Sequence, residues 1–132
     1  AASHRILVVE DQPAVRQLAS DMLRGMGHAV VAACDGDEAR EVLLANSHFD
    51  AVISDIVMPG KLDGRSLARW ISDHFPHIKT LLTSGYHEYQ GDQLGYPLLG
   101  KPYSLRTLST ALDELFSKAP VSVSATDLPV LS

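Results

Sequence analysis

Short apolar runs alternate with helix-like segments along this chain of 132 residues. The runs are rich in Val, Ile and Leu and lie at residues 5–11, 28–33, 49–55, 78–83 and 97–99. Continuous apolar strands joined by helices are typical of right-handed βαβ units in a sheet covered on both faces. The alternation therefore predicts a single α/β domain, a doubly wound, five-stranded parallel sheet with helices on both faces.

The intervening segments show helical spacing of apolar residues. Val15, Leu18, Ala19, Met22 and Leu23 follow the i, i+3, i+4 pattern of one helix face. Further helices are expected at residues 37–46, around 67–75 and, after a Ser104 N-cap, at 105–116. Residues 84–96 contain three glycines and little periodicity, so we expect a short or irregular fourth helix there. Residues 1–118 are the predicted domain, and 119–132 are a predicted tail or linker.

Bulk composition excludes several classes of protein. The formal net charge of −5 gives no reason to expect direct binding of nucleic acid or of an acidic membrane. No apolar run approaches the roughly 20 residues of a transmembrane helix, and the amino terminus lacks the pattern of a signal peptide. A single cysteine, Cys34, rules out an internal disulfide and suits a reducing compartment. We expect a cytoplasmic domain without a membrane segment.

Polar side chains stand at the ends of four predicted strands. Glu10 and Asp11 close the first run, Asp55 the third and Thr83 the fourth, while Lys101 follows the fifth. The carboxyl ends of parallel strands meet at one edge, where ligands bind. Each residue alone could be a helix cap or a solvated loop residue, but their joint occurrence favours a shared site. Three carboxylates, a hydroxyl and an ammonium suit a divalent cation such as Mg²⁺ and a phosphoryl group.

The order of these residues resembles the receiver domain of two-component response regulators. The resemblance runs from about Arg5 to Lys118 and implies a flavodoxin-like (βα)5 fold with a shortened fourth helix. The matching motifs are Glu10-Asp11, Asp55, Met58-Pro59, Asp63-Gly64, Thr83-Ser84 and Lys101-Pro102-Tyr103. The segments MPGKLDG and LLTSGY resemble receivers fused to hybrid sensor histidine kinases.

The resemblance implies a role for each matched residue. Asp55 is the expected phosphoacceptor, taking a phosphoryl group from a histidine kinase or a histidine phosphotransfer protein. Mg²⁺ is expected to be bound by Asp11 and Asp55, by Glu10 through a water, and by the backbone carbonyl of Val57. Such a domain is not an enzyme acting on a separate substrate, although it assists its own phosphorylation and dephosphorylation.

Further contacts to the phosphoryl group are implied in the same way. They come from Lys101, the hydroxyl of Thr83 and the backbone amides of Ile56 and Ser84. The peptide bond before Pro102 is expected to be cis. Thr83 is the expected switch residue that reports phosphorylation to a protein-interaction surface, and a homodimer is one possible assembly.

The chain departs from the family pattern at the second switch position. Family members commonly carry an aromatic residue three positions before the lysine, where this chain has Leu98. Tyr96, two residues earlier, should share the face of Leu98. A receiver-like interaction module that does not switch therefore stays as the alternative. A hydrolase of the haloacid dehalogenase type is disfavoured because Val57 stands where that class requires a second acid. A nucleotide-binding flavodoxin-like protein is disfavoured because Glu10-Asp11, after the first strand, would repel the phosphate of a nucleotide.

Overall fold

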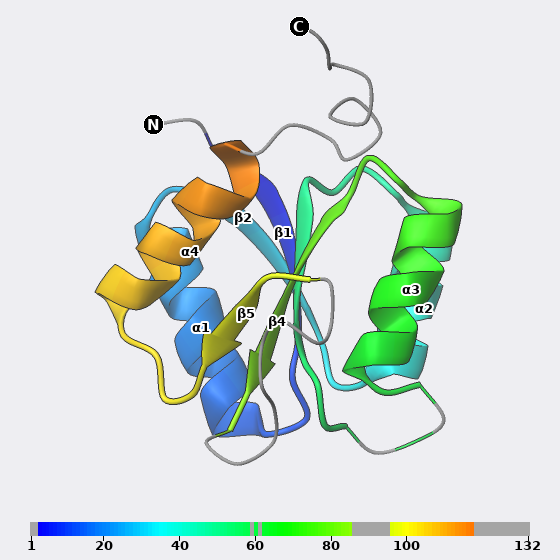
Figure 1. The fold of residues 1–132 in the computed structure, drawn as a ribbon, viewed down its shortest axis with the longest axis horizontal. Helices are drawn as coiled ribbons and strands as arrows, with labels where there is room; N and C mark the ends of the chain where they lie inside the picture. Colours follow the sequence, from blue (N-terminus) through cyan, green and yellow to red (C-terminus); the bar gives the residue numbers. More distant parts are fainter. Residues whose placement is uncertain (1–2, 59, 61, 86–95, 118–132) are drawn as a thin grey trace, which may run out of the picture.

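The computed structural model describes residues 3–58, 60, 62–85 and 96–117. Strands and helices alternate up to β4, as predicted, and Figure 1 shows their arrangement. The strands are β1 (Arg5–Val9), β2 (Ala29–Ala33), β3 (Ala51–Asp55), β4 (Lys79–Ser84) and β5 (Leu98–Gly100). The helices are α1 (Pro13–Gly25), α2 (Gly36–Ala45), α3 (Gly64–His74) and α4 (Leu105–Ser117).

The strands form one parallel sheet in the order β2-β1-β3-β4-β5. Chain order reverses at β1, so the carboxyl edges of β1 and β3 form the switch point at which α/β sheets bind ligands. Asp55 pairs in register with Thr83, and Ser84 pairs with Gly100. The predicted five-stranded, doubly wound sheet is confirmed.

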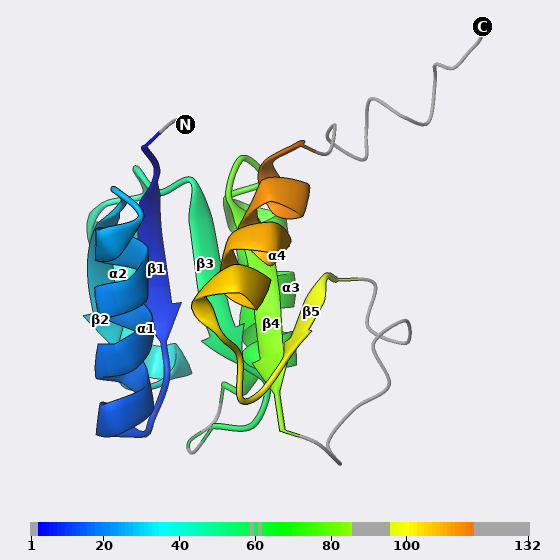
Figure 2. The same cartoon turned by 90° about the vertical axis from the view of Figure 1, so that its left-hand side faces the viewer.

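Both faces of the sheet are covered, which explains the continuous apolar runs. Helices α1 and α4 lie on one face and α2 and α3 on the other, as Figures 1 and 2 show. Along β1, Ile6 and Val8 pack in the core beneath α1 and α4, while Leu7 and Val9 pack beneath α2 and α3. All four side chains are at most 2% exposed. Strand alternation therefore buries successive residues in two separate cores.

Several predicted boundaries hold, and some lie outside the described residues. Ser104 caps the last helix, since its Oγ accepts a hydrogen bond from the Thr107 amide at 3.2 Å. Strand β5 lies one residue later than predicted. The expected fourth helix falls largely on residues 86–95 and the expected tail on 118–132, which the structure does not describe. Within the described ranges, no helix has the length and hydropathy to span a bilayer.

Candidate functional site

Five predicted site residues meet at the carboxyl edge of the sheet. Glu10 follows β1, Asp55 ends β3, Thr83 lies beside it in β4, and Lys101 follows β5. Glu10, Asp55 and Thr83 are each at most 6% exposed, whereas Asp11 is more accessible. The site is therefore a mostly buried polar cluster with an open acidic side.

The three carboxylates converge although two of them are neighbours in sequence. One oxygen each from Glu10, Asp11 and Asp55 lies within 4.8 Å of the others. Strand β1 ends at Val9, so the strict alternation of side chains no longer applies to residues 10 and 11. Both acids therefore turn toward one crevice with Asp55.

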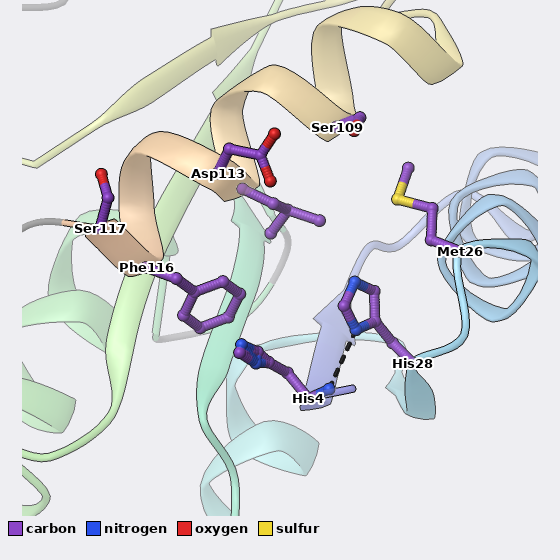
Figure 3. Close-up of a pocket in the computed structure, with 8 residues that line it drawn as sticks. His4, Met26, His28, Ser109, Asp113, Phe116 and Ser117 are labelled. Atoms are coloured by element: carbon purple, nitrogen blue, oxygen red, sulfur yellow. Dashed lines mark hydrogen bonds between the residues drawn. The ribbon is translucent and has the colours of Figure 1, made fainter. Parts of the chain in front are cut away.

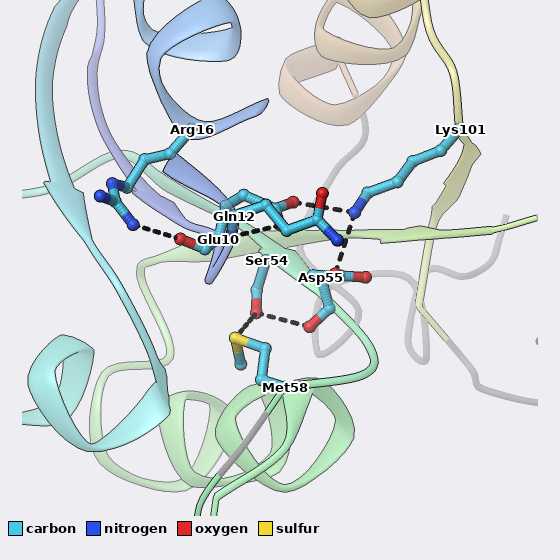
Figure 4. Close-up of polar contacts among 7 residues, drawn as sticks. All are labelled: Glu10, Gln12, Arg16, Ser54, Asp55, Met58 and Lys101. Carbon is cyan, nitrogen blue, oxygen red and sulfur yellow. Dashed lines mark hydrogen bonds and ion pairs between the residues drawn. The ribbon is translucent and has the colours of Figure 1, made fainter. Parts of the chain in front are cut away.

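Lys101 joins two of these carboxylates directly. Its Nζ donates to Oε1 of Glu10 at 2.8 Å and to Oδ2 of Asp55 at 2.9 Å, as Figure 4 shows. Burial lowers the pKa of Lys101, but hydrogen bonds to Glu10 and then Asp55 outweigh it, so its pKa is raised overall. Burial raises the pKa of Glu10 despite its hydrogen bond to Lys101. The ammonium is thus held charged between two acids.

The charge of the cluster fits a divalent cation. Three carboxylates and one ammonium carry a formal charge of −2 when all are ionised. Burying net negative charge is costly unless a cation neutralises it, and hard divalent cations prefer oxygen ligands. The donor set, all oxygen and clustered within 4.8 Å, therefore matches the chemistry of such an ion.

Backbone hydrogen bonds fix the strand ends that carry the site. The Ile56 amide donates to the carbonyl of Thr83 at 2.9 Å, and the Lys101 amide donates to the carbonyl of Ser84 at 2.7 Å. The Lys101–Pro102 peptide bond is cis, as predicted. The Ile56 amide thus extends the β3–β4 ladder, a different partner from the phosphoryl oxygen expected for it. Val57, whose carbonyl was predicted to bind the cation, is 55% exposed beside the site.

The second switch position, Leu98, lies on the α3 side of the sheet edge. Leu98 packs with Tyr96 against the buried cluster of Ile56, Ala68 and Leu82. Tyr96 therefore shares the face of Leu98, as strand alternation predicted. The Tyr96 hydroxyl lies 3.2 Å from Oγ of Ser72 on α3. An aromatic side chain thus packs against the cluster that contains Ile56, from a position two residues earlier than the usual one.

Sequence reasoning missed several groups that support the site. Arg16 donates from Nη1 to the Glu10 carbonyl at 2.9 Å, and the Gln12 amide donates to Oε2 of Glu10 at 3.2 Å (Figure 4). Ser54 Oγ donates to the Asp55 carbonyl at 3.0 Å and lies 3.9 Å from Sδ of Met58. Contacts between a side chain and a backbone atom have no periodic signature. The only available signal was a buried-strand serine immediately before the acid.

Comparison with known proteins agrees with this geometry. Residues 6–113 match the family described as response regulator receiver domain. The chain is 35% identical over 124 residues to the sensor kinase CckA of Brucella abortus, covering 89% of this chain and 13% of that protein. It is 43% identical over 82 residues to the response regulator protein FleR of Pseudomonas aeruginosa, covering 62% of this chain and 17% of that protein.

Solved structures show the same likeness. The receiver domain from the hybrid histidine kinase CckA superposes with a TM-score of 0.71 at 33% identity, covering 84% of this chain and 97% of that one. The response regulator protein TrrA of Thermotoga maritima, in complex with Mg²⁺-BeF, has a TM-score of 0.76 at 30% identity, with 85% and 98% covered.

The chain spans less than a fifth of CckA and of FleR, so the similarity concerns one domain of each. Within that domain it extends over the sheet and the strand-end residues that form the site. The predicted likeness to the receivers of hybrid kinases is supported by CckA in both sequence and structure. The family match covers most of the chain and the fold agrees, so this chain belongs to the response regulator receiver domain family.

Proposed function

We propose that Asp55 accepts the phosphoryl group in a two-component phosphorelay. The observation that carries this proposal is Lys101, whose ammonium contacts Asp55 and Glu10 within a cluster of three carboxylates. An ammonium held 2.9 Å from Oδ2 of Asp55 can neutralise a phosphoryl group that arrives there. Phosphoryl transfer depends mainly on such positioning and charge neutralisation.

Asp55 is better placed than Glu10 to be the acceptor. Both oxygens of Glu10 accept hydrogen bonds, one from Lys101 and one from the Gln12 amide. Asp55 ends β3, where Thr83 and Lys101 flank it. One of its carboxylate oxygens forms the new bond to phosphorus as the bond to the donor imidazole nitrogen breaks. The imidazole leaves with that electron pair, and the product is an aspartyl phosphate.

Mg²⁺ is the cation we propose for this site. Asp11 and Asp55 would bind it directly, Glu10 through a water, and the Val57 carbonyl would complete the protein ligands. When bound, Mg²⁺ supplies positive charge to the phosphoryl oxygens. The fit rests on the formal charge of −2 and on the all-oxygen donor set described above.

Phosphorylation is proposed to switch a protein-interaction surface through Thr83. Its side chain is buried beside Asp55 in register, within reach of a group attached there. The Ser84 amide, one residue later, is a further proposed donor to the phosphoryl group, and Leu98 occupies the second switch position. Tyr96 and Leu98 pack against the cluster of Ile56, Ala68 and Leu82, which links the residue after Asp55 to α3. A module that does not switch would leave these side chains unchanged on phosphorylation.

The donor is proposed to dock over an apolar groove beside Lys101. A cavity of about 320 Å³ is lined by Val15, Leu18, Lys101, Pro102 and Tyr103. Leu18 is 56% exposed there, so a docking partner could bury its side chain. We propose that a helical histidine kinase or histidine phosphotransfer protein covers this groove. The similarity to CckA favours a donor of the hybrid-kinase type.

Acetyl phosphate tests the proposed chemistry without a cognate donor. The wild type and Asp55→Asn are incubated with acetyl phosphate and Mg²⁺, with and without chelator, and intact mass is followed. We expect one phosphoryl adduct on the wild type that needs Mg²⁺ and is absent from Asp55→Asn. An adduct that persists on Asp55→Asn would refute the assignment of Asp55.

A beryllofluoride titration followed by amide NMR then tests switching. If the domain switches, the amide chemical shifts of Thr83 and Tyr96 should change.

A further inference from the structure

Arg16 makes a contact that the phosphorylation chemistry does not explain. It lies in the second turn of α1, and its Nη1 donates to the backbone carbonyl of Glu10 at 2.9 Å, as Figure 4 shows. The hydrogen bond is partly buried, and Ser20, 3% exposed, donates from Oγ to the Arg16 carbonyl at 2.8 Å. The guanidinium is therefore held at the end of β1 by the carbonyl of Glu10, one of the three acids of the cluster.

The Glu10 carbonyl lies where the chain leaves the sheet. The Glu10 amide still donates to the Ala33 carbonyl at 3.1 Å, which continues the β1–β2 ladder. Its carbonyl faces Arg16 instead, and its carboxylate accepts from the Gln12 amide. The direction of the next peptide determines where Asp11 points, because two adjacent acids can share a crevice only if the strand turns between them.

The usual anchors at the start of α1 are absent. Gln12 is the N-cap and makes no side-chain cap hydrogen bond, and Pro13 opens the helix without an amide donor. By contrast, α2 and α3 are capped by Asp35 and Asp63. The hydrogen bond from Arg16 to Glu10 therefore ties α1 to the strand end in place of a cap.

We propose that Arg16 is a positioning residue for the cation site. By holding the Glu10 carbonyl it fixes the turn after β1, so that Glu10 and Asp11 both face Asp55. The inference rests on the proposed function, since it concerns the cation used in phosphoryl transfer. Groups that orient metal ligands typically change metal affinity by about tenfold to hundredfold when removed.

The sign of the effect separates positioning from simple charge. Arg16 carries a positive charge near the cation site, so removing it on electrostatic grounds alone would tighten Mg²⁺ binding. Loss of positioning predicts the opposite, because Asp11 would no longer be held toward Asp55. The direction of the change therefore decides between the two, whatever its size.

Arg16→Met and Arg24→Met form a matched pair for this test. Arg24 lies on the same helix and also donates to a backbone carbonyl, that of Val30, but at the far end of α1. Mg²⁺ alone is titrated into each protein, and the amide NMR shifts of Asp11 and Ile56 give the dissociation constant. We expect the dissociation constant to rise about tenfold in Arg16→Met and to stay within about twofold of wild type in Arg24→Met.

The conservative variant covers the case of misfolding. Arg16→Lys keeps the charge and an N–H donor, so we expect an affinity between those of wild type and Arg16→Met. If Arg16→Met does not fold, Arg16→Lys decides alone, and an unchanged dissociation constant overturns the proposal. Equal or tighter binding by folded Arg16→Met also overturns it. If wild type binds Mg²⁺ but takes a phosphoryl group neither from acetyl phosphate nor from a histidine phosphotransfer protein, the proposed function fails independently of Arg16.

Discussion

Gly64 lies with its α-carbon against the carbonyl oxygen of Asp55, so closely that a β-carbon there would overlap that oxygen. Gly64 is the buried first residue of α3, and its amide donates to the Ile56 carbonyl at 2.8 Å. Asp63 caps the helix by accepting from the Ser66 amide at 2.9 Å. The start of α3 thus contacts the carbonyl groups of both Asp55 and Ile56. A movement of the Asp55–Ile56 peptide would therefore also move the start of α3.

Gly64→Ala should destabilise the fold and slow phosphorylation together. The added methyl group meets backbone atoms of Asp55 and Ile56, which cannot move aside as a flexible side chain would. Overpacking of this kind costs about 1–3 kcal/mol. Urea denaturation measures the free energy of unfolding, and intact mass with acetyl phosphate measures the rate.

Gly25→Ala is the matched control. Gly25 ends α1, and a β-carbon there would meet no atom within 4 Å. Replacing a helical glycine by alanine stabilises by about 0.5–1 kcal/mol, so this variant should be at least as stable as wild type. If both variants gain stability, the close contact between α3 and Asp55 is not present in solution.

Lys101→Met should separate cation binding from phosphoryl transfer. Without the ammonium, the carboxylates of Glu10 and Asp55 are no longer neutralised and the cluster is more negative. Mg²⁺ should therefore bind several-fold more tightly. The rate of phosphorylation should nevertheless fall by about a hundredfold, the usual effect of losing one preorganised charge stabiliser. NMR titration gives the affinity and intact mass the rate. Arg106→Met, which removes an exposed charge from α4, should leave both unchanged.

The strand ends could be predicted because they depend on short-range patterns. Apolar runs covered on both faces define the strands, and parallel pairing brings their carboxyl ends together. Glu10, Asp55, Thr83 and Lys101 were therefore located from sequence and a resemblance, and the structure places them at one edge. Shifts of one or two residues at strand ends, as in β5, depend on how far each ladder extends.

Contacts across turns could not be predicted in the same way. The partner of the Ile56 amide depends on the β3–β4 ladder continuing one residue beyond Asp55, and no periodicity encodes that. The hydrogen bond from Arg16 to Glu10 joins a helix side chain to a strand-end carbonyl. The close approach of Gly64 to Asp55 is likewise a tertiary contact, visible in the sequence only as a glycine after Asp63.

The Tyr96 hydroxyl and Ser72 should contribute as one unit. Their oxygens lie 3.2 Å apart, linking the segment before β5 to α3. Tyr96→Phe and Ser72→Ala should each lower the free energy of unfolding by about 0.5–1.5 kcal/mol, the net value of one hydrogen bond. In a double-mutant cycle the double variant should lose little more than either single one. Additive losses would show that the two hydroxyls act independently.

Acid should weaken the opposite end of the sheet through His28. The His4 amide donates to Nδ1 of His28 at 3.0 Å, and the pocket around them is lined by Met26, Asp113 and Phe116 (Figure 3). Burial, and then the nearby His4, lower the pKa of His28 from its ordinary 6.5, although Asp50 opposes this. The unfolded chain therefore binds more protons near this pH, so stability from His28 is present above about pH 6.5 and is lost as pH falls.

His28→Asn isolates this contribution. Its side-chain oxygen can accept the same hydrogen bond from His4 without titrating. Urea denaturation at pH 7.5 and 5.5 should show a larger loss of stability in the wild type than in His28→Asn. Because all other side chains are the same in the two proteins, only the difference between them reports on His28. Equal losses would exclude His28 as the source.

Leu18→Ser should slow phosphorylation by a protein donor and leave acetyl phosphate chemistry intact. Leu18 lines the groove beside Lys101 and is 56% exposed, so its replacement should not disturb the core. A docked donor would bury this side chain, and losing a buried leucine contact costs about 1.5–3 kcal/mol, which corresponds to a fall in kcat/KM of roughly tenfold or more.

Leu44→Ser is the matched control, since Leu44 is 64% exposed on α2. With a histidine phosphotransfer protein as donor, kcat/KM should fall for Leu18→Ser alone, while both variants react with acetyl phosphate at the wild-type rate. Equal kcat/KM for the two variants would place the docking surface away from α1.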